Sequence, residues 1–205
     1  MQAESMAAEP AGKKVVKERM PNPVRSARTR EKLLNATIQC LYELGYDQTS
    51  TVLVTKRAGV SRGAMLHQFP SKADLMLAVF NHISDQRVIA HREALEGLRD
   101  PREILRKLID ISWSELSKPN GIARVEIMLA SRSDKEIGER FSALNEALQQ
   151  RHRDWMWRLA QKAGVTDQAA IETMAHLYAS ALRGLAIDAL DPAARPRTHA
   201  AIAIA

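Results

Sequence analysis

The sequence predicts an all-α protein in which a small N-terminal head is joined by one long helix to a larger helical body. Apolar residues recur every three to four positions over most of the 205-residue chain, which is the spacing of amphipathic helices. No segment alternates polar and apolar residues over the length of a strand. Near the N-terminus, VTKRAGVSRGAMLHQF at residues 54–69 holds two short helical patterns around a tight turn. Helices this short need packing against a neighbour to be stable.

The head is expected to follow a basic arm. Residues 1–23 lack apolar periodicity, carry four lysines and arginines and end at Pro-Asn-Pro, which is typical of a flexible segment. An apolar face then predicts a first helix from about Ser26 to Gly45, where glycine ends it. Hydroxyl caps predict a second helix to Ala58 and, after Ser61, a third helix of about seven residues.

The long helix is predicted to start after Pro70-Ser71 and to continue to Asp100-Pro101, because one apolar stripe extends over this whole range. At ~1.5 Å per residue, its length would be about 40 Å. The tail to Ala205 is ambiguous, with a short helix as one reading. Further stripes predict body helices at residues 101–117, 122–130, 134–163 and 167–190.

The positive charge of the chain is confined to its first third. Residues 1–72 contain twelve Lys and Arg against six Asp and Glu, whereas the remainder is balanced, so the formal charge of +6 lies in the head and arm. A positive end on a neutral body favours a polyanionic partner, with nucleic acid ahead of an anionic membrane surface. A solvated basic tail without a partner is the alternative.

The two short helices match a helix-turn-helix, in which the second helix enters the major groove of DNA. Ala58 and Gly59 supply the small residues that a sharp turn needs, and Val60 can fill the space between the helices. The run from Arg30 to Leu75 resembles the tetracycline-repressor-like (TetR) family of transcriptional regulators. The segments LLNATIQCLYELGYDQTS, AGVSRGAML and FPSKADL carry this resemblance, which covers about a quarter of the chain.

The resemblance implies a division of the chain and a set of DNA contacts. Residues 24–72 would be the DNA-binding domain and residues 73–205 an effector-binding and dimerisation domain. Ser50, Thr51 and Lys72 would bind phosphates, and Arg62 would read a guanine. Arg25 and Arg28 would act as a basic arm on the backbone or in the minor groove. The implied DNA-binding residues are Arg25, Arg28, Ser50, Thr51, Ser61, Arg62, Gly63, His67, Gln68 and Lys72.

Three positions depart from the family pattern. Leu66 stands where a phosphate-contacting tyrosine is usual, Gln68 where histidine or tyrosine is common, and Leu53 where an acidic or polar residue is common. Leu66 is therefore expected to touch a thymine methyl or to pack, and Val52 could make similar apolar contacts. Gln68 can still donate to a phosphate.

The resemblance also implies a two-fold dimer formed by the last two long helices, which here carry a near-heptad apolar stripe and many small residues. The candidate interface residues are Leu144, Leu148, Leu159, Ala181, Leu182 and Leu185. A small-molecule effector in the body would tilt the long helix and spoil the ~34–36 Å spacing of the two recognition helices.

A pocket for that effector is less well specified by the sequence. Apolar and aromatic residues suit an apolar ligand, and a few polar ones could orient it, although each of these residues could equally belong to the core or to the dimer interface. The candidates are Trp113, Arg124, Met128, Phe141, Trp155, Met156, Met174, His176 and Tyr178. Glu126 is a further polar residue in an apolar stretch.

No pattern favours an enzyme. The six histidines lack metal-ligand spacing, Cys40 has no cysteine partner, and there is no phosphate-binding glycine loop or nucleophile elbow, so neither a metal nor a cofactor is expected. Without a membrane span or a signal peptide, the expected location is cytoplasmic. We therefore expect a ligand-responsive regulator, by family habit a repressor, that binds a palindromic operator as a homodimer. A constitutive DNA-binding protein without an effector is the alternative.

Overall fold

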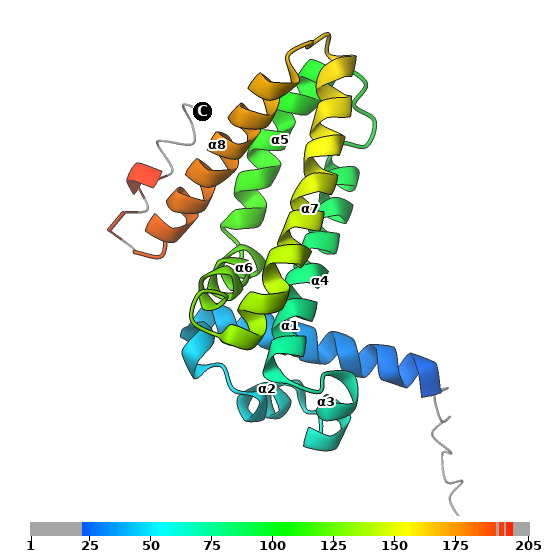
Figure 1. Cartoon of the computed structure of the whole chain (residues 1–205), viewed down its shortest axis with the longest axis vertical. Coiled ribbons are helices and arrows are strands. Elements are labelled where there is room, and N and C mark those ends of the chain that lie inside the picture. Colours follow the sequence, from blue (N-terminus) through cyan, green and yellow to red (C-terminus); the bar gives the residue numbers. More distant parts are fainter. Residues whose placement is uncertain (1–21, 192, 195, 199–205) are drawn as a thin grey trace, which may run out of the picture.

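A computed structural model describes residues 22–191, 193–194 and 196–198, and these residues form eight helices and no strand. The predicted arm at residues 1–21 and the end of the tail lie outside this range. Figure 1 shows α1, α2 and α3 at one end of an elongated molecule, with the other helices forming the body along its long axis. The helices are α1 Asn22–Gln48, α2 Thr51–Ala58, α3 Arg62–Gln68, α4 Lys72–Ala94, α5 Pro101–Leu116, α6 Pro119–Ala130, α7 Lys135–Lys162 and α8 Gln168–Asp188.

The all-α prediction is confirmed, and the short helices begin where their capping residues predict. The Ser50 hydroxyl accepts a hydrogen bond from the Leu53 amide, and the Ser61 hydroxyl accepts one from Ala64. Gly59 closes α2 with φ +62°, a left-handed conformation that favours glycine. The α2–α3 connection therefore has the tight geometry that its sequence indicates.

Helix α1 differs from the prediction at both ends. It starts at Asn22 rather than Ser26, so Arg25 and Arg28 belong to a helix and not to an arm. Gly45 interrupts it with φ 75° and ψ 177°, and one more helical turn follows to Gln48. The glycine was correctly identified as a break, but the chain resumes helical geometry after the kink.

Two body helices also have other bounds than predicted. Helix α4 ends at Ala94 and measures about 34 Å, because the chain turns at Gly97, which has φ +83°. Helix α6 begins at Pro119 rather than at Ile122. Proline fits the first position of a helix because its missing N–H would be unpaired there anyway, so the Pro-Asn-Gly segment forms a first turn instead of a break.

Most of the apolar core is a single cluster, here called the lower core, that extends from the head into the body. It contains Leu33, Val54, Met65 and Phe69 of the head, and it continues without a gap to Phe80 of α4 and further residues of α6 and α7. A Cβ on Gly121 would lie 2.1 Å from the Leu116 carbonyl oxygen, so glycine allows α6 to turn closely after α5. The head is thus packed directly onto α6 and the start of α7.

The upper body, made of α5, α8 and the C-terminal half of α7, is packed differently. Its buried cluster contains only Leu116, Leu182 and Ala186, with Trp113, Tyr178 and Leu185 packed beside them. Figure 1 shows these helices running side by side with the upper half of α4. The small cluster leaves room for a cavity.

Candidate nucleic-acid interface and body cavity

Helix α3 presents a polar outer face and an apolar inner one. Met65 is buried against Val54 and Phe69, whereas Arg62, Gly63, Leu66 and His67 are exposed. Within the described residues, the Arg62 guanidinium has no ion pair or hydrogen bond, so its donors are free for an external acceptor. No atom lies within 4 Å of the position that a Cβ on Gly63 would occupy, so the space beside this glycine is open to the approach of another backbone.

The first turns of α1 pack beside α3. The Gln68 side-chain amide donates to the Ser26 hydroxyl at 2.7 Å, and the Arg30 guanidinium lies 4.6 Å from the centre of the Phe69 ring. Arg25 and Arg28 are exposed near these contacts. Gln68 is therefore engaged in holding α1 against α3, a contact that the sequence did not reveal.

The hydroxyl and ammonium groups predicted to bind phosphates lie at helix N-termini. Ser50 is exposed and Thr51 is partly buried at the start of α2. Lys72 opens α4, where its ammonium donates to the Tyr46 carbonyl oxygen at 3.1 Å and lies 3.8 Å from the centre of the Tyr46 ring. Burial lowers the pKa of Lys72, partly offset by Asp134 and Asp47. The charge of Lys72 is thus held in place by the kinked end of α1.

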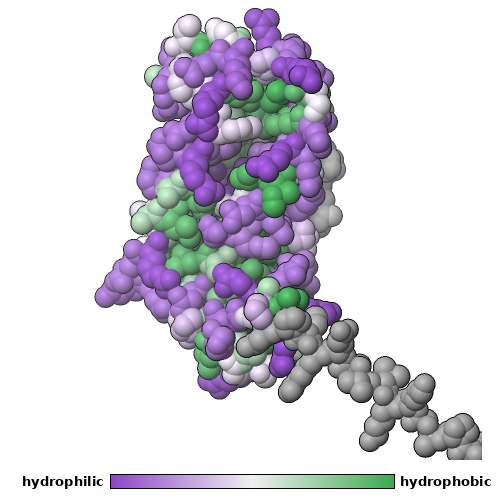
Figure 2. All heavy atoms as spheres, turned by 90° about the vertical axis from the view of Figure 1, so that its right-hand side faces the viewer, coloured by the Kyte–Doolittle hydropathy of each residue, from purple (hydrophilic) through white to green (hydrophobic). Residues whose placement is uncertain are grey.

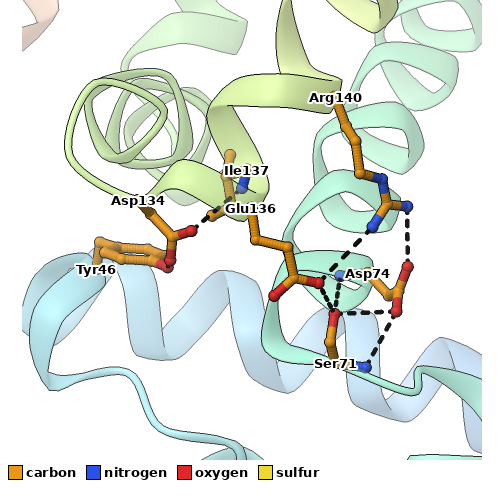
Figure 3. Close-up of polar contacts among 7 residues, drawn as sticks. All are labelled: Tyr46, Ser71, Asp74, Asp134, Glu136, Ile137 and Arg140. Atoms are coloured by element: carbon orange, nitrogen blue, oxygen red, sulfur yellow. Dashed lines mark hydrogen bonds and ion pairs between the residues drawn. The ribbon is translucent and has the colours of Figure 1, made fainter.

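The same end of α1 is bonded to the body, and we call this the head–body contact. The Tyr46 hydroxyl donates to the Asp134 carboxylate just before α7, and the Tyr46 amide donates to Glu126 of α6 at 2.8 Å. Figure 3 shows the tyrosine and Asp134 facing each other. The hydrogen bond from Tyr46 lowers the pKa of Asp134, while burial and Asp134 raise the pKa of Tyr46.

A second set of polar contacts joins the start of α4 to α7. Ser71 caps α4 together with Asp74, and the Ser71 hydroxyl also donates to Glu136 at 2.6 Å. Arg140 pairs with Asp74 at 2.9 Å and lowers the pKa of that carboxyl. As Figure 3 shows, these residues lie on the far side of Glu136 from the head–body contact, so the end of α1 and the start of α4 are both bonded to the N-terminal end of α7.

The body contains a cavity of about 920 Å³ between α4, α5, α6, α7 and α8. Five of the nine predicted pocket residues line it: Arg124, Trp155, Met156, Met174 and Tyr178. Its aliphatic walls include Leu105, Leu108, Ile109 and Ile171. Figure 2 shows apolar residues reaching the surface of one face of the body in separate patches among hydrophilic ones.

The other four predicted pocket residues lie elsewhere. Phe141 is buried in the lower core, with its ring 4.8 Å from that of Phe80, and Met128 packs against the same cluster. Trp113 packs on Leu116 and Leu182 outside the cavity lining, and His176 is exposed. Helical periodicity places an apolar residue inside the fold, but it does not distinguish a solid core from a cavity wall.

The polar lining of the cavity is strongly basic. Arg87 of α4 and Arg183 of α8 join Arg124 of α6, and neither was identified from the sequence. Arg87 follows Ile83 by four residues within the apolar stripe of α4, and this position was the available signal. Burial lowers the pKa of all three, and with the two other arginines nearby it brings that of Arg124 to about 9.

Two histidines lie at the cavity as well. Burial, followed by the charge of Arg87, lowers the pKa of His91 to about 4, and the pKa of His152 is lowered to about 4 by the same causes together with His91 and Arg124. Both rings are therefore neutral at pH 7. The Nε2 of His91 is shielded from solvent and has no hydrogen-bond partner in the described structure.

The predicted interface residues are mostly inside the chain. Leu182 and Leu159 are buried, Leu148 lines the cavity, and Leu144 and Leu185 pack against the lower core and Leu116 respectively. Leu159 and Leu182 lie on sides of α7 and α8 that face the body of their own chain. Ala181 is exposed. The outer face of α8 instead exposes Leu177 and Ile187, while Met174 is exposed at the mouth of the cavity.

Within the described part of the chain, no group of three His, Cys, Asp or Glu side chains is arranged to hold a metal ion. None of the described helices combines the length and apolar character that crossing a membrane would require. Cys40 is buried in the lower core, where burial raises the pKa of its thiol.

Comparison with protein families identifies the head. The family described as "Bacterial regulatory proteins, tetR family" matches residues 33–79, from the middle of α1 through the helix-turn-helix into α4. The match covers the helix-turn-helix part of the chain and agrees with the resemblance that the sequence of this part shows. The match begins within α1 and ends within α4, so it contains the whole of α2 and α3. It also includes the head residues of the lower core.

Curated HTH-type transcriptional regulators extend the likeness beyond the head. The HTH-type transcriptional regulator CymR of Pseudomonas putida is 28% identical over 81% of this chain and 81% of its own length. Other curated HTH-type regulators match over 59% or 48% of their own length. The names of the family and of these relatives are those of transcriptional regulators.

Solved structures share the fold. A TetR transcription regulator from Haloarcula marismortui superposes with a TM-score of 0.67 over 87% of this chain and 94% of its own, at 17% identity. A transcriptional regulator from Saccharomonospora viridis, solved in complex with choline, gives a TM-score of 0.62 over 80% of this chain and 86% of its own, at 19% identity.

Proposed function

We propose that this protein is a ligand-responsive transcriptional repressor of the TetR family that binds a palindromic operator through the outer face of α3. The observation that carries the proposal is that Arg62, which has no partner in the described structure, and His67 are both exposed on the outer face of α3. This helix is capped by Ser61 and follows the tight turn at Gly59. A guanidinium grips guanine through O6 and N7, which makes Arg62 the principal reader. Exposed Val52 and Leu66 add apolar contacts of the kind that thymine methyls accept.

The surrounding residues fix the register of the head on the backbone. Ser50, Thr51 and Lys72 lie at helix N-termini, where a hydroxyl or ammonium donor and the helix dipole both favour a phosphate. Arg25 and Arg28 on the first turns of α1 add positive charge next to α3. Gly63 allows the DNA backbone to come close. In this arrangement residues 24–72 form the DNA-binding part and residues 73–205 the regulatory part.

Two copies of the chain are needed to read both halves of a palindrome. The outer face of α8 is the surface best suited to join them, because Leu177 is 60% exposed and Ile187 is 44% exposed. Ala181 and Gly184 on the same face are small enough for a second helix to approach closely. Pairing α8 with the partner's α8 would cover these apolar side chains.

The cavity provides the regulatory input. The neighbour from Saccharomonospora viridis was solved in complex with choline, which supports a small-molecule ligand for a protein of this fold. A ligand between α4 and the upper body acts on the helix whose first residue, Lys72, contacts the kink of α1. The ligand releases DNA by binding more tightly to the conformation in which the two α3 helices no longer match the groove spacing.

Selection of bound fragments from the source genome tests this function. Enrichment of a palindrome with half-sites about one helical turn apart is expected. Arg62→Ala should relax the base preference and cost ~1–3 kcal/mol of binding, while Lys72→Ala should weaken all sequences alike and reduce the salt slope. Arg106→Ala, an exposed position on α5, is the control. Equal effects of the Arg62 and Lys72 substitutions would contradict the assigned roles.

A constitutive DNA-binding protein without an effector is the alternative, and it needs no cavity. The two functions are separated by measuring operator affinity against a panel of small molecules that bind the cavity. A ligand that occupies the cavity and leaves operator affinity unchanged would favour the constitutive reading.

A further inference from the structure

Three arginines meet at the cavity without carboxylate partners. Arg87, Arg124 and Arg183 come from α4, α6 and α8, and we refer to them as the arginine group. Among the described residues none of the three forms an ion pair, and the Nε of Arg87 is shielded from solvent without a hydrogen-bond acceptor. Arg124 has only the face of the Phe80 ring at 4.5 Å and the Ser84 hydroxyl at 3.5 Å.

Several other arginines of the chain are paired with a carboxylate although they are more exposed. Arg57 lies 2.5 Å from Glu43, Arg140 lies 2.9 Å from Asp74, and Arg153 lies 2.6 Å from Glu146. Burying a charge costs free energy unless an opposite charge or a set of hydrogen bonds compensates it. The hydrogen-bond acceptors of the arginine group in the described structure are two neutral hydroxyls, Ser84 for Arg124 and Ser180 for Arg183 at 2.9 Å, and no carboxylate compensates the charge. Burial and then mutual repulsion lower the pKa of Arg87 and of Arg124.

Nearby acids do not supply it. Asp154 is the one carboxylate among the described residues that line the cavity, and it accepts a hydrogen bond from Gln150. Glu115, the acid that acts electrostatically on Arg87, pairs with Lys118 at 2.8 Å. Six arginines line the same space. The field inside the cavity is therefore positive.

The remaining walls are apolar. Leu105, Leu108, Ile109, Trp155 and Ile171 surround the rest of the volume. The Tyr178 hydroxyl, shielded from solvent and without a partner in the described structure, adds one neutral donor. A volume of about 920 Å³ is large enough for a drug-sized organic molecule.

We propose that the cavity binds an amphipathic organic anion, with its acidic head group on Arg87, Arg124 and Arg183 and its aromatic or aliphatic body against the apolar walls. A guanidinium fits a carboxylate, sulfonate or phosphate through two parallel hydrogen bonds, which recovers the free energy that burial of the arginines costs. This inference rests on the proposed ligand-responsive function and names the chemical class of its effector.

A matched pair of fluorescent probes tests the charge requirement. 8-Anilinonaphthalene-1-sulfonate and N-phenyl-1-naphthylamine share one aromatic skeleton, but only the first carries an anionic group. We expect the full-length protein to bind the sulfonate at least tenfold more tightly than the neutral amine. Arg124→Met and Arg183→Met should each weaken the sulfonate at least tenfold and change the affinity for the amine less than twofold.

Controls separate the arginine group from general charge and from loss of structure. Arg106→Met removes an exposed arginine outside the cavity lining and should leave both affinities unchanged. Arg124→Lys keeps the charge without the planar fork and should give an intermediate loss. The melting temperature of each free variant should equal or exceed that of the wild type, and a marked fall in both Arg124→Met and Arg183→Met would assign these arginines a structural role and overturn the proposal.

Equal affinity for the two probes, no binding of the sulfonate, or equal loss of both probes in the arginine variants would also overturn it. The proposed function is judged separately by operator binding. Release of the operator by a neutral compound that binds at the cavity, in a protein that shows no preference for the sulfonate, would refute the anion and leave ligand-responsive repression intact. An anion that binds tightly in the cavity and leaves operator affinity unchanged would support the anion site and refute ligand-responsive repression.

Discussion

The two ends of the molecule contain similar helices but are packed in opposite ways. In the lower part, α1, α2, α3, α6 and the first turns of α4 and α7 share one continuous core in which Leu33, Val54, Leu75 and Ile127 are fully buried. In the upper part, only three residues form the buried cluster, and a cavity with unpaired arginines occupies the centre. The closely packed part can hold the proposed DNA-reading surface rigid, while the unpaired arginines of the cavity leave a cost of burial that the proposed ligand would offset.

The largest predicted effect contrasts two leucines. Leu75 is 0% exposed in the lower core, and Leu108 is 7% exposed at the cavity wall. Leu75→Ala should lower the free energy of unfolding by about 4 kcal/mol, whereas Leu108→Ala should cost about 2 kcal/mol because its side chain already borders empty space. Urea unfolding at pH 7 measures both. Equal losses would mean that the upper body is as closely packed as the lower core.

The second effect is a pH dependence that arises in the upper body. The pKa of His91 is about 4 in the folded chain, against about 6.5 when unfolded. Between these values His91 is protonated in the unfolded chain and neutral in the folded chain. The folded state is therefore favoured fully above pH 6.5, and the free energy of unfolding falls as the pH is lowered toward 4. The loss should reach about 3 kcal/mol for this group. Unfolding at several pH values measures it.

His91→Gln should flatten that part of the pH profile, and His152→Gln should do so in a similar way, since both histidines lie at the cavity with the arginine group. An unchanged slope in both variants would place the titrating groups elsewhere in the molecule.

A third effect has the opposite sign. Arg87→Met should raise the free energy of unfolding of the ligand-free chain by about 1–2 kcal/mol, because it replaces an uncompensated buried charge with an apolar side chain. Arg140→Met, which breaks the ion pair with Asp74 in the lower part, should not stabilise the chain. Calorimetric melting of the two variants beside wild type distinguishes them, and destabilisation by Arg87→Met would show that this arginine is compensated after all.

The smallest effect concerns the head–body contact. Tyr46→Phe removes the hydrogen bond to Asp134 and should cost about 1 kcal/mol, a modest figure because both groups are partly exposed to solvent. The pKa of Asp134 should rise toward its usual value, as NMR titration can record. Tyr42→Phe, at an exposed tyrosine on α1, is the matched control and should change neither quantity.

The head was largely predictable from the sequence because short-range signals determine it. Ser50, Gly59 and Ser61 act through their own backbone geometry, and α2 and α3 occupy the positions that these residues indicate. The body depends on which helix face meets which neighbour, and periodicity does not contain that information. Leu182, expected at an interface, is therefore buried, while Leu177 on the same helix is exposed.

The cavity was only partly predictable for a related reason. Trp155 and Tyr178 follow from an aromatic preference for ligand sites, but Arg87 and Arg183 resemble ordinary surface charges on an amphipathic helix. Their significance lies in the absence of an ion-pair partner in the described structure, which is a property of the assembled helices. Gln68 shows the same limit in the head, since only the fold places it against Ser26.

The central claim is that occupation of the hollow upper body controls the solid DNA-reading part. Fluorescence anisotropy of a labelled palindrome, chosen by genomic selection, measures this directly when titrated with and without an organic anion that displaces the sulfonate probe. We predict that saturating anion weakens DNA binding at least tenfold and that DNA weakens anion binding by the same factor, as linkage requires. Simultaneous binding of both, each with unchanged affinity, would contradict the claim.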